Sequence, residues 1–315
     1  MRVLFHAPGP ASHGVVRHSA LVADLAAAHG VRAVASNPDV VHAQFTDGLY
    51  GPDTRAAATA FETWAATAPR PLVVTLHDVP GADPDPRRGA ARAESYRRVV
   101  AACDAAVVSS RHEADKVARL GGDPVRVIDL PLPHLPTPGD RPPWAAIPTL
   151  GVLGFVYPGK GHAEAITAAA RQPTRPAVVA MGAVSTGHDD LAASLHTLAA
   201  DLGVRFTITG TLSDTEMASA VAAVTVPLAL NRGVSASGSL LTWLAGRRKP
   251  LTAHGDYADE VAAHSPVWLY DDLDDAITAA LADPTRTTLP NPPPWPDTGA
   301  AHRALYDSVH AAVPC

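Results

Sequence analysis

Short runs of β-branched and apolar residues alternate with helical segments along almost the whole chain, and this alternation restricts the fold more than any other feature. The pattern predicts strands at residues 2–7, 31–36, 39–45, 71–78 and 105–110, and again at 149–156, 176–182, 204–210, 221–230 and 249–255. Strands that are separated by helices form parallel sheets with both faces covered. The sequence therefore predicts an α/β protein.

A proline-rich stretch divides the alternation into two parts. Residues 130–148 have the composition of a stiff, extended linker. A chain of 315 residues is also longer than most single domains. We therefore expect two similar α/β domains that join near residue 145, followed by an amphipathic helix at 301–313.

Composition excludes several classes of protein. Hydrophobic residues make up 47% and charged residues 18%, as in a soluble globular protein, and no apolar run approaches the roughly 18 residues of a membrane span. The N-terminus has too few apolar residues for a signal peptide, and two cysteines make no disulfide framework, so a cytoplasmic location is expected. A net charge of -6 argues against nucleic acid as a partner.

Ligands of doubly wound sheets bind beyond the carboxyl ends of the strands, where the strand order reverses. Chemistry is therefore expected in the polar, glycine-rich loops that follow predicted strands, at residues 8–14, 77–81, 154–162 and 233–239. Two such domains that face each other are expected to enclose a cleft.

The loop at 154–162 carries Lys160, one of three lysines against twenty-two arginines. It lies between a predicted strand and a predicted helix, where backbone N–H groups and the positive helix end favour an anion. Gly159 and Gly161 leave room for a close backbone approach. The sequence predicts a phosphate contact, and the alternative is a tight turn with a solvated lysine.

A serine-rich loop precedes the predicted helix at 240–246. Ser235, Ser237 and Ser239 alternate with small residues, a pattern typical of a helix N-cap and of an anion-binding nest. Arg232 could add a bidentate phosphate contact. No acidic residue occurs from residue 217 through 255, whereas the same window holds four cations. This balance favours a diphosphate, and a plain capping loop is the alternative.

His77 ends a predicted strand, with Asp78 beside it. A histidine in that place can act as a general base, a hydrogen-bond donor or an electrostatic stabiliser. The alternative is a His-Asp pair that only packs at the strand end. His42 has a similar place on the preceding strand.

The loop that opens the first predicted helix is basic and contains a glycine, so it could hold a phosphate or a carboxylate. Its residues are His13, Gly14, Arg17 and His18. Other chemistries have little support, because the chain lacks HExxH, CxxC, Gly-x-Ser-x-Gly, a P-loop and Gly-x-Gly-x-x-Gly. No metal site is predicted.

Taken together, these loops resemble the retaining glycosyltransferases of family 4, whose GT-B fold has two facing Rossmann-like domains. The similar segments are residues 12–30 (first glycine-rich loop and helix), 38–45 (the DVVHxH strand), 72–78 (the strand with a cleft histidine), 103–133 (the end of the first domain), 154–161 (the Gly-x5-Lys-Gly layout) and 206–230 (the frame of the base). The resemblance implies domains at 1–145 and 146–297, with a C-terminal helix at 298–312 packing back on the first.

The resemblance also implies roles for the matching residues. In the family the lysine of the Gly-x5-Lys-Gly layout contacts the donor diphosphate, and the first glycine-rich loop lies near the acceptor. The implied donor site comprises Gly154, Gly159, Lys160, Gly210, Thr211, Leu212, Arg232, Ser235, Ser237, Gly238 and Ser239. The implied acceptor site comprises His13, Gly14, Arg17, His18 and Asp78.

The chain departs from the family at two places. The family's arginine after the first glycine of the lysine loop is Phe155 here. The family's paired glutamates, which contact the sugar and the ribose hydroxyls, fall near Val234 and near Thr242 or Trp243. Ribose reading and sugar orientation must therefore differ from the family or be absent.

We expect a glycosyltransferase that moves a sugar from a nucleoside-diphosphate sugar to a small-molecule, glycan or lipid-linked acceptor, with His77 as the catalytic residue. The resemblance implies retention of the anomeric configuration, and no cofactor or metal is expected. The alternatives are a non-catalytic GT-B-like protein that binds a nucleotide or glycan as a partner, and a nucleotide-sugar epimerase or phosphorylase on the same fold.

Overall fold

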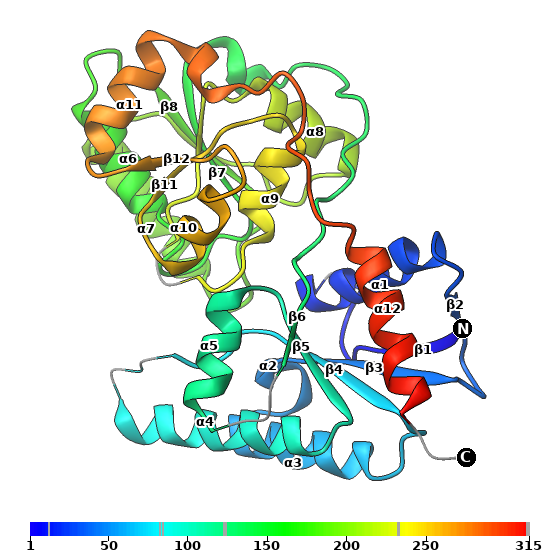
Figure 1. Ribbon diagram of the computed structural model, residues 1–315. Helices are drawn as coiled ribbons and strands as arrows, with labels where there is room; N and C mark the ends of the chain where they lie inside the picture. The colour runs from blue at the N-terminus through cyan, green and yellow to red at the C-terminus, as the bar shows by residue number, and fades with distance from the viewer. Residues whose placement is uncertain (12, 82, 84, 122–124, 232–233, 313–315) are drawn as a thin grey trace. The chain divides into compact units, whose positions relative to one another are not determined.

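The computed structural model describes the chain except residues 12, 82, 84, 122–124, 232–233 and 313–315. The described chain divides into two compact units (Figure 1): a first unit, Met1–Pro131 with Pro296–Cys315, and a second unit, Leu132–Trp295. Each unit holds, within the described residues, a six-stranded sheet in which every pair of named strands is parallel. Helices alternate with the strands, and the predicted α/β fold class is confirmed.

The first unit has the strand order β2-β1-β3-β4-β5-β6. Its elements are β1 (Arg2–His6), α1 (Gly14–Ala27), β2 (Arg32–Ala33), β3 (Val40–Phe45), α2 (Asp47–Tyr50), α3 (Thr54–Ala65), β4 (Leu72–Leu76), α4 (Pro86–Ala101), β5 (Ala105–Val108), α5 (Arg111–Arg119), β6 (Arg126–Val127) and α12 (Thr298–Ala311). The last helix packs against α1, far away in sequence (Figure 1).

The second unit has the strand order β12-β11-β10-β7-β8-β9. Its elements are η1 (Pro143–Ala146), β7 (Thr149–Leu153), α6 (His162–Arg171), β8 (Ala177–Met181), α7 (Asp189–Asp201), β9 (Phe206–Ile208), α8 (Asp214–Ala223), β10 (Val226–Leu228), α9 (Gly238–Ala245), β11 (Leu251–Ala253), α10 (Asp256–Ala262), β12 (Trp268–Tyr270), α11 (Leu273–Ala282) and η2 (Pro284–Thr287).

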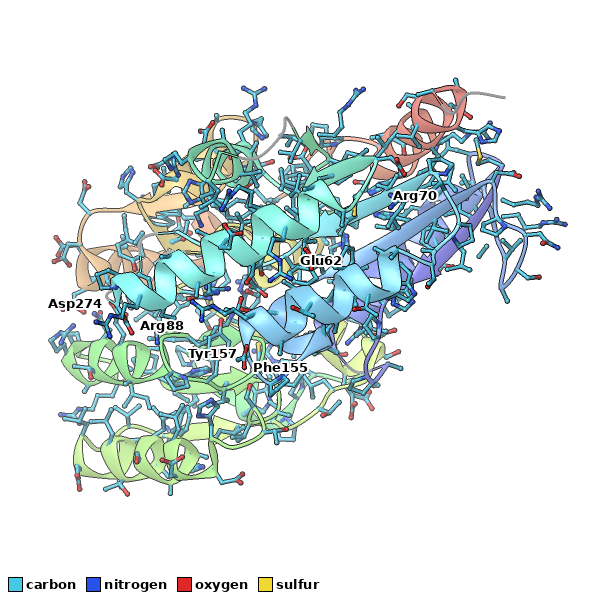
Figure 2. The ribbon with its side chains drawn as sticks, turned by 90° about the horizontal axis from the view of Figure 1, so that it is seen from below. Glu62, Arg70, Arg88, Phe155, Tyr157 and Asp274 are labelled. Carbon is cyan, nitrogen blue, oxygen red and sulfur yellow. The ribbon has the colours of Figure 1, made fainter. Side chains whose placement is uncertain are left out.

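Each sheet packs apolar side chains on both of its faces, so each unit has two cores, and one face of the first sheet also buries polar side chains. In β4 of the first unit, Leu72, Val74 and Leu76 pack toward α3 and α4, whereas Val73 packs toward α1 and α12. Figure 2 labels Glu62 on α3, where its Oε1 accepts a hydrogen bond of 2.9 Å from Nε of Arg98 on α4. In the second unit one core lies under α6, α7 and α11, and the other lies under α8 and α9.

Local side-chain caps decide where most helices begin. The residue before the helix accepts a hydrogen bond from the first turn in α1, α3, α4, α5, α8, α9, α11 and α12. In α1 the cap is His13, whose Nδ1 accepts from the backbone N–H of Val15 at 3.2 Å, so the helix begins at Gly14. Among the described residues, no helix is both long enough and apolar enough to cross a membrane.

Candidate functional site

The strand order of the second unit reverses beside β7, which lies between β10 and β8. The loops after β7 and β10 therefore flank the place where doubly wound sheets bind ligands. Backbone and side chain meet closely there, because a Cβ added to Gly161 would lie 2.4 Å from the Cβ of Leu230. The φ of Gly161 is +94°, a left-handed conformation that glycine adopts without strain.

Lys160 is buried between these two loops, with 8% of its surface exposed. Its Nζ donates a hydrogen bond of 2.9 Å to Oγ of Ser239, which is 79 residues away in sequence. Gly154, at φ +110°, leaves space for the lysine, because a Cβ there would lie 3.3 Å from both Cε and Nζ. The solvated lysine of the alternative interpretation is therefore wrong.

Burial lowers the pKa of Lys160 from 10.5 to about 8. No described carboxylate forms an ion pair with it. The neighbouring His162 is buried as well, and burial followed by the charge of Lys160 lowers its pKa to about 4. The loop thus holds one ammonium that is poorly solvated and has a neutral imidazole for a neighbour.

The serine loop forms the N-terminus of α9. Oγ of Ser237 accepts from the backbone N–H of Leu240 at 3.2 Å and lies 3.2 Å from Oγ of Ser239. Gly238 is exposed, and Ser235 is half-buried. A lysine, two hydroxyls and a helix N-terminus therefore gather at one place, an arrangement suited to an anion. The predicted contact from Arg232 lies outside the described residues.

A pocket of about 460 Å³ adjoins the same loop on the side of α6 and α7. The described residues that line it are Tyr157, Pro158, Gly159, Gly161, His162, Ala163, Glu164, Leu191, Leu195 and Leu230. Gly159 is exposed at φ +86°, with nothing within 4 Å of an added Cβ. The hydroxyl of Tyr157 accepts from Nδ2 of Asn231 at 2.7 Å, which again joins the two loops.

Gly210, Thr211 and Leu212 follow β9 at the same edge of the sheet, two strands from β7. At about 4.8 Å a strand, that separation is about 10 Å. Thr211 is exposed, and Leu212 packs against the core under α8 and α9. The structure therefore brings Lys160 and Ser239 into contact, whereas residues 210–212 follow a strand two positions away from β7 in the sheet.

The positions where the family has charged residues are occupied differently. Phe155, labelled with Tyr157 in Figure 2, is 48% exposed. Trp243 is fully buried, and its Nε1 donates to the carbonyl of Leu228 at 3.2 Å. Thr242 bonds within its own helix, to the carbonyl of Gly238 at 2.8 Å.

The cations that follow α9 do not belong to this site, which corrects the expectation drawn from the charge balance. Arg248 is buried and donates to the carbonyls of Val221, Ala222, Thr225 and Thr287 at 2.9 to 3.3 Å. Lys249 has its Nζ 5.9 Å from the ring centroid of Trp268. Both follow the C-terminal end of α9, about 12 Å along the axis from its start at 1.5 Å per residue.

In the first unit, His77 follows β4 directly and is half-buried. Its Nε2 lies 2.8 Å from Oε1 of Gln44, and the hydroxyl of Tyr96 donates to its carbonyl at 2.7 Å. Burial, followed by the charge of His13, lowers the pKa of His77 to about 4. The ring of His18 lies edge-on to it, 5.1 Å between centroids.

Only some of the other predicted acceptor residues lie close to His77 at the end of β4. Asp78 has a left-handed φ of +53° and accepts from Oγ1 of Thr46 at 2.9 Å. Gly14 and Arg17 are exposed on the first turn of α1. The structure therefore brings His18 and His77 together, while Arg17 lies on the exposed side of the helix.

Sequence reasoning missed three partners of this histidine group. Gln44, Tyr306 and His302 are all buried on the face of the sheet that α1 and α12 cover. The signal was the alternation of polar residues at 42 and 44 and at 75 and 77 in two adjacent strands. His42 does not lie at the sheet edge as expected but is fully buried within β3. No cluster of three or more metal-ligating side chains occurs among the residues that the structure describes.

Known proteins share this architecture. Residues 4–133 match the family model described as glycosyl transferase 4-like domain. No curated protein matches the chain. Anabaena HepE in complex with UDP-glucose superposes with a TM-score of 0.70 at 15% identity, covering 98% of this chain and 95% of that one.

Two further solved structures are similar along their whole length. Sucrose-phosphate synthase from Thermosynechococcus elongatus has a TM-score of 0.75 at 14% identity, covering 99% of this chain and 100% of that one. A glycosyltransferase from Rickettsia africae has a TM-score of 0.65 at 13% identity, with 98% of each chain covered. Residues 4–133 thus match a glycosyl transferase 4-like family model, and the chain has the GT-B fold of these solved structures.

Proposed function

We propose that the protein is a glycosyltransferase that moves a sugar from a nucleoside-diphosphate sugar to a hydroxyl of an acceptor, with retention of the anomeric configuration. The second unit binds the donor, and the first unit supplies His77 and the acceptor contacts around His13, Gly14 and His18. Retention and the acceptor class follow from the resemblance to family 4.

The observation that carries the proposal is the buried ammonium of Lys160 at the reversal point of the second sheet. Burial lowers its pKa to about 8, so the ammonium stands in an unfavourable environment that a bound anion improves. Ser239 Oγ and the N-terminus of α9 add dipoles directed at the same place. Such a cradle stabilises the charge that develops on a diphosphate leaving group.

The diphosphate of a nucleoside-diphosphate sugar fits this arrangement of Lys160, Ser239 and the N-terminus of α9. HepE, which shares the fold, was crystallised with UDP and with UDP-glucose, so UDP is the first nucleotide to test here. Lys160 and the helix N-terminus carry the positive potential in this proposal, and no metal ion is required. Turnover that persists in excess EDTA would support a reaction without a metal ion.

Calorimetric titration of UDP tests the role of Lys160. Lys160→Ala should weaken UDP binding by roughly 1.5 to 3 kcal/mol, the range for hydrogen bonds to charged groups. Lys249→Ala is the matched control, because Lys249 lies beside Trp268 beyond the other end of α9. Equal affinity of wild type and Lys160→Ala would remove the observation on which the proposal rests.

A second candidate is a non-catalytic nucleotide-binding protein of the same fold. It is favoured by the absence of a carboxylate near Val234 and near Thr242 or Trp243, where the family has its two glutamates. UDP-glucose incubated with a panel of acceptors separates the two: a glycosylated product or released UDP indicates an enzyme. Tight UDP binding without either product indicates the binding protein.

A further inference from the structure

Polar side chains replace apolar ones along one face of the first sheet. In β3 and β4 the residues that face α3 and α4 are apolar and belong to the core on that side. Because side chains alternate along a strand, His42, Gln44 and Thr75 face α1 and α12 instead. Gln44 and Thr75 are direct partners in the parallel register of the two strands.

These residues form one continuous hydrogen-bonded chain that ends at His77. Oε1 of Gln44 lies 2.8 Å from Nε2 of His77, and Nε2 of Gln44 lies 3.4 Å from Nε2 of His42. Nε2 of His42 also lies 2.8 Å from Oγ1 of Thr75. Nδ1 of His42 lies 2.7 Å from the hydroxyl of Tyr306 on α12.

With the amide of Gln44 oriented as its contacts are given, one placement of protons satisfies every contact in the chain. The amide oxygen of Gln44 cannot donate, so Nε2 of His77 must carry a proton. The amide nitrogen of Gln44 only donates, so Nε2 of His42 must be unprotonated and can also accept from Thr75. Neutral His42 then carries its proton on Nδ1 and donates it to the hydroxyl of Tyr306.

We propose that Gln44 is a positioning residue that fixes His77 as its Nε2-protonated tautomer and leaves Nδ1 as a hydrogen-bond acceptor for a hydroxyl group of the substrate. The hydroxyl part of this inference rests on the proposed function, whereas the tautomer does not. A neutral ring nitrogen with a lone pair accepts from a hydroxyl and repels a phosphate oxygen. His77 therefore selects a sugar or acceptor hydroxyl, and Lys160 holds the phosphate.

The amide is important because it does not titrate. The groups that face His77 are His13 at the N-cap of α1, His18 on α1, His42 on β3 and the hydroxyl of Tyr96 on α4. The carboxylate of Asp78, the next residue, accepts from Oγ1 of Thr46 instead of from the ring. No described carboxylate hydrogen-bonds the ring, so nothing in this set stabilises a charged imidazolium.

Long-range proton–nitrogen correlation spectra of the full-length, ¹⁵N-labelled protein read both tautomers directly. His77→Gln and His42→Gln assign the two sets of signals. We expect the proton on Nε2 in His77 and on Nδ1 in His42, opposite tautomers in one hydrogen-bonded chain. The reverse pattern, which corresponds to Gln44 with its amide group turned round, would overturn the proposal.

Substitutions at Gln44 separate positioning from packing. Gln44→Leu should give a mixture of His77 tautomers and lower kcat for UDP-glucose turnover on the order of tenfold, with KM little changed. Gln44→Glu keeps an acceptor oxygen and should keep the proton on Nε2 of His77. Gln172→Leu is the matched control, since Gln172 is a buried glutamine of the second unit, and it should leave the histidine spectra unchanged.

The two readouts distinguish this inference from the proposed function. Loss of the fixed tautomer in Gln44→Leu and its return in Gln44→Glu support the positioning role, whether or not UDP-glucose is turned over. An unchanged His77 spectrum in Gln44→Leu overturns that role. Absence of turnover with every sugar nucleotide and acceptor counts against the proposed function and against the hydroxyl part alone.

Discussion

Burial lowers the pKa of both Lys160 and His77, but at neutral pH it leaves the lysine charged and the histidine neutral. It brings Lys160 near the point where the ammonium loses its proton, and it prevents the His77 ring from gaining one. Holding Lys160 charged with a pKa of about 8 instead of 10.5 costs about 3 kcal/mol at neutral pH. A bound diphosphate removes part of that cost, which makes the residue a better anion site than an exposed lysine.

The pH dependence of UDP binding follows from this shift. Below about pH 8 Lys160 is already protonated in the free site, so the titration of Lys160 should not make affinity change with pH. Above that value a proton must be taken up for the ammonium to meet the phosphate, so the Kd should rise by up to about tenfold per pH unit. Calorimetry between roughly pH 7 and 9.5 measures this rise in the Kd, and the rise above about pH 8 should be absent in Lys160→Ala. A flat wild-type profile would contradict the assignment.

His77→Ala should affect rate more than binding. Because His77 is proposed to contact the reacting sugar or acceptor, its loss should lower kcat at least about a hundredfold. UDP affinity should be unchanged, since the proposed diphosphate contacts are all in the second unit. His310→Ala, on the exposed face of α12, serves as the control in the same turnover assay. Near-normal turnover of His77→Ala would leave that histidine a packing role only.

At the scale of elements, the approach of the β7–α6 loop to the β10–α9 loop can be tested with two glycines. Gly159 and Gly161 both have left-handed φ, +86° and +94°, so alanine at either position is strained by about 1 to 2 kcal/mol. At Gly161 the new Cβ also meets Leu230, which adds about 1 to 3 kcal/mol of overpacking. In urea unfolding, the free energy of unfolding of Gly161→Ala should therefore be lower than that of Gly159→Ala. Equal free energies of unfolding would show that the two loops do not meet closely.

Strands with uninterrupted apolar runs were predictable from sequence, and those with mixed runs were not. β4 and β8 coincide with the runs at 71–78 and 176–182 because both of their faces are buried. The run at 31–36 gives only β2, Arg32–Ala33. The run at 221–230 divides, because residues up to Ala223 complete α8 before β10 begins at Val226.

The site was predictable to the extent that it lies at strand ends. The rule for doubly wound sheets directs attention to the loops with Lys160 and Ser239, whereas the 2.9 Å contact between them needs tertiary structure. The capping role of Ser237 was readable from the sequence, and the commitment of Arg248 to backbone carbonyls was not. Arg248 lies in a run of three cations, where nothing local distinguishes a buried arginine from a solvated one.

At the scale of the whole molecule, the buried histidines should make the folded state sensitive to acid. Burial lowers the pKa of His18, His42, His77 and His302 below the usual 6.5. Below that value the unfolded chain binds protons that the folded chain does not. Stability is therefore full above about pH 6.5 and falls by up to about 1.4 kcal/mol per pH unit for each ring as pH drops toward about 4.

Urea unfolding at about pH 7 and about pH 5 measures this loss. His302→Leu removes one buried ring and should reduce the difference, whereas His310→Ala removes an exposed ring and should not. Equal unfolding free energies at the two pH values would mean that the folded chain takes up the same protons. Burial would then not keep the four histidine rings neutral in the folded chain.

The central claim is that the diphosphate, not the ribose, dominates recognition of the donor. Lys160, Ser239 and the N-terminus of α9 meet at the proposed phosphate site. No carboxylate stands at Val234 or Thr242, and that of Glu216 already accepts from the backbone N–H and hydroxyl of Ser213.

Titration of UDP, UMP, uridine and 2'-deoxy-UDP tests this claim most directly. Affinity should fall steeply from UDP to UMP to uridine, because each step removes a phosphate from the cradle. Loss of the 2'-hydroxyl should cost less than about 1 kcal/mol, since only a neutral or water-mediated contact disappears. Uridine binding as tightly as UDP, or a deoxy analogue about tenfold weaker, a difference of about 1.4 kcal/mol, would contradict the account.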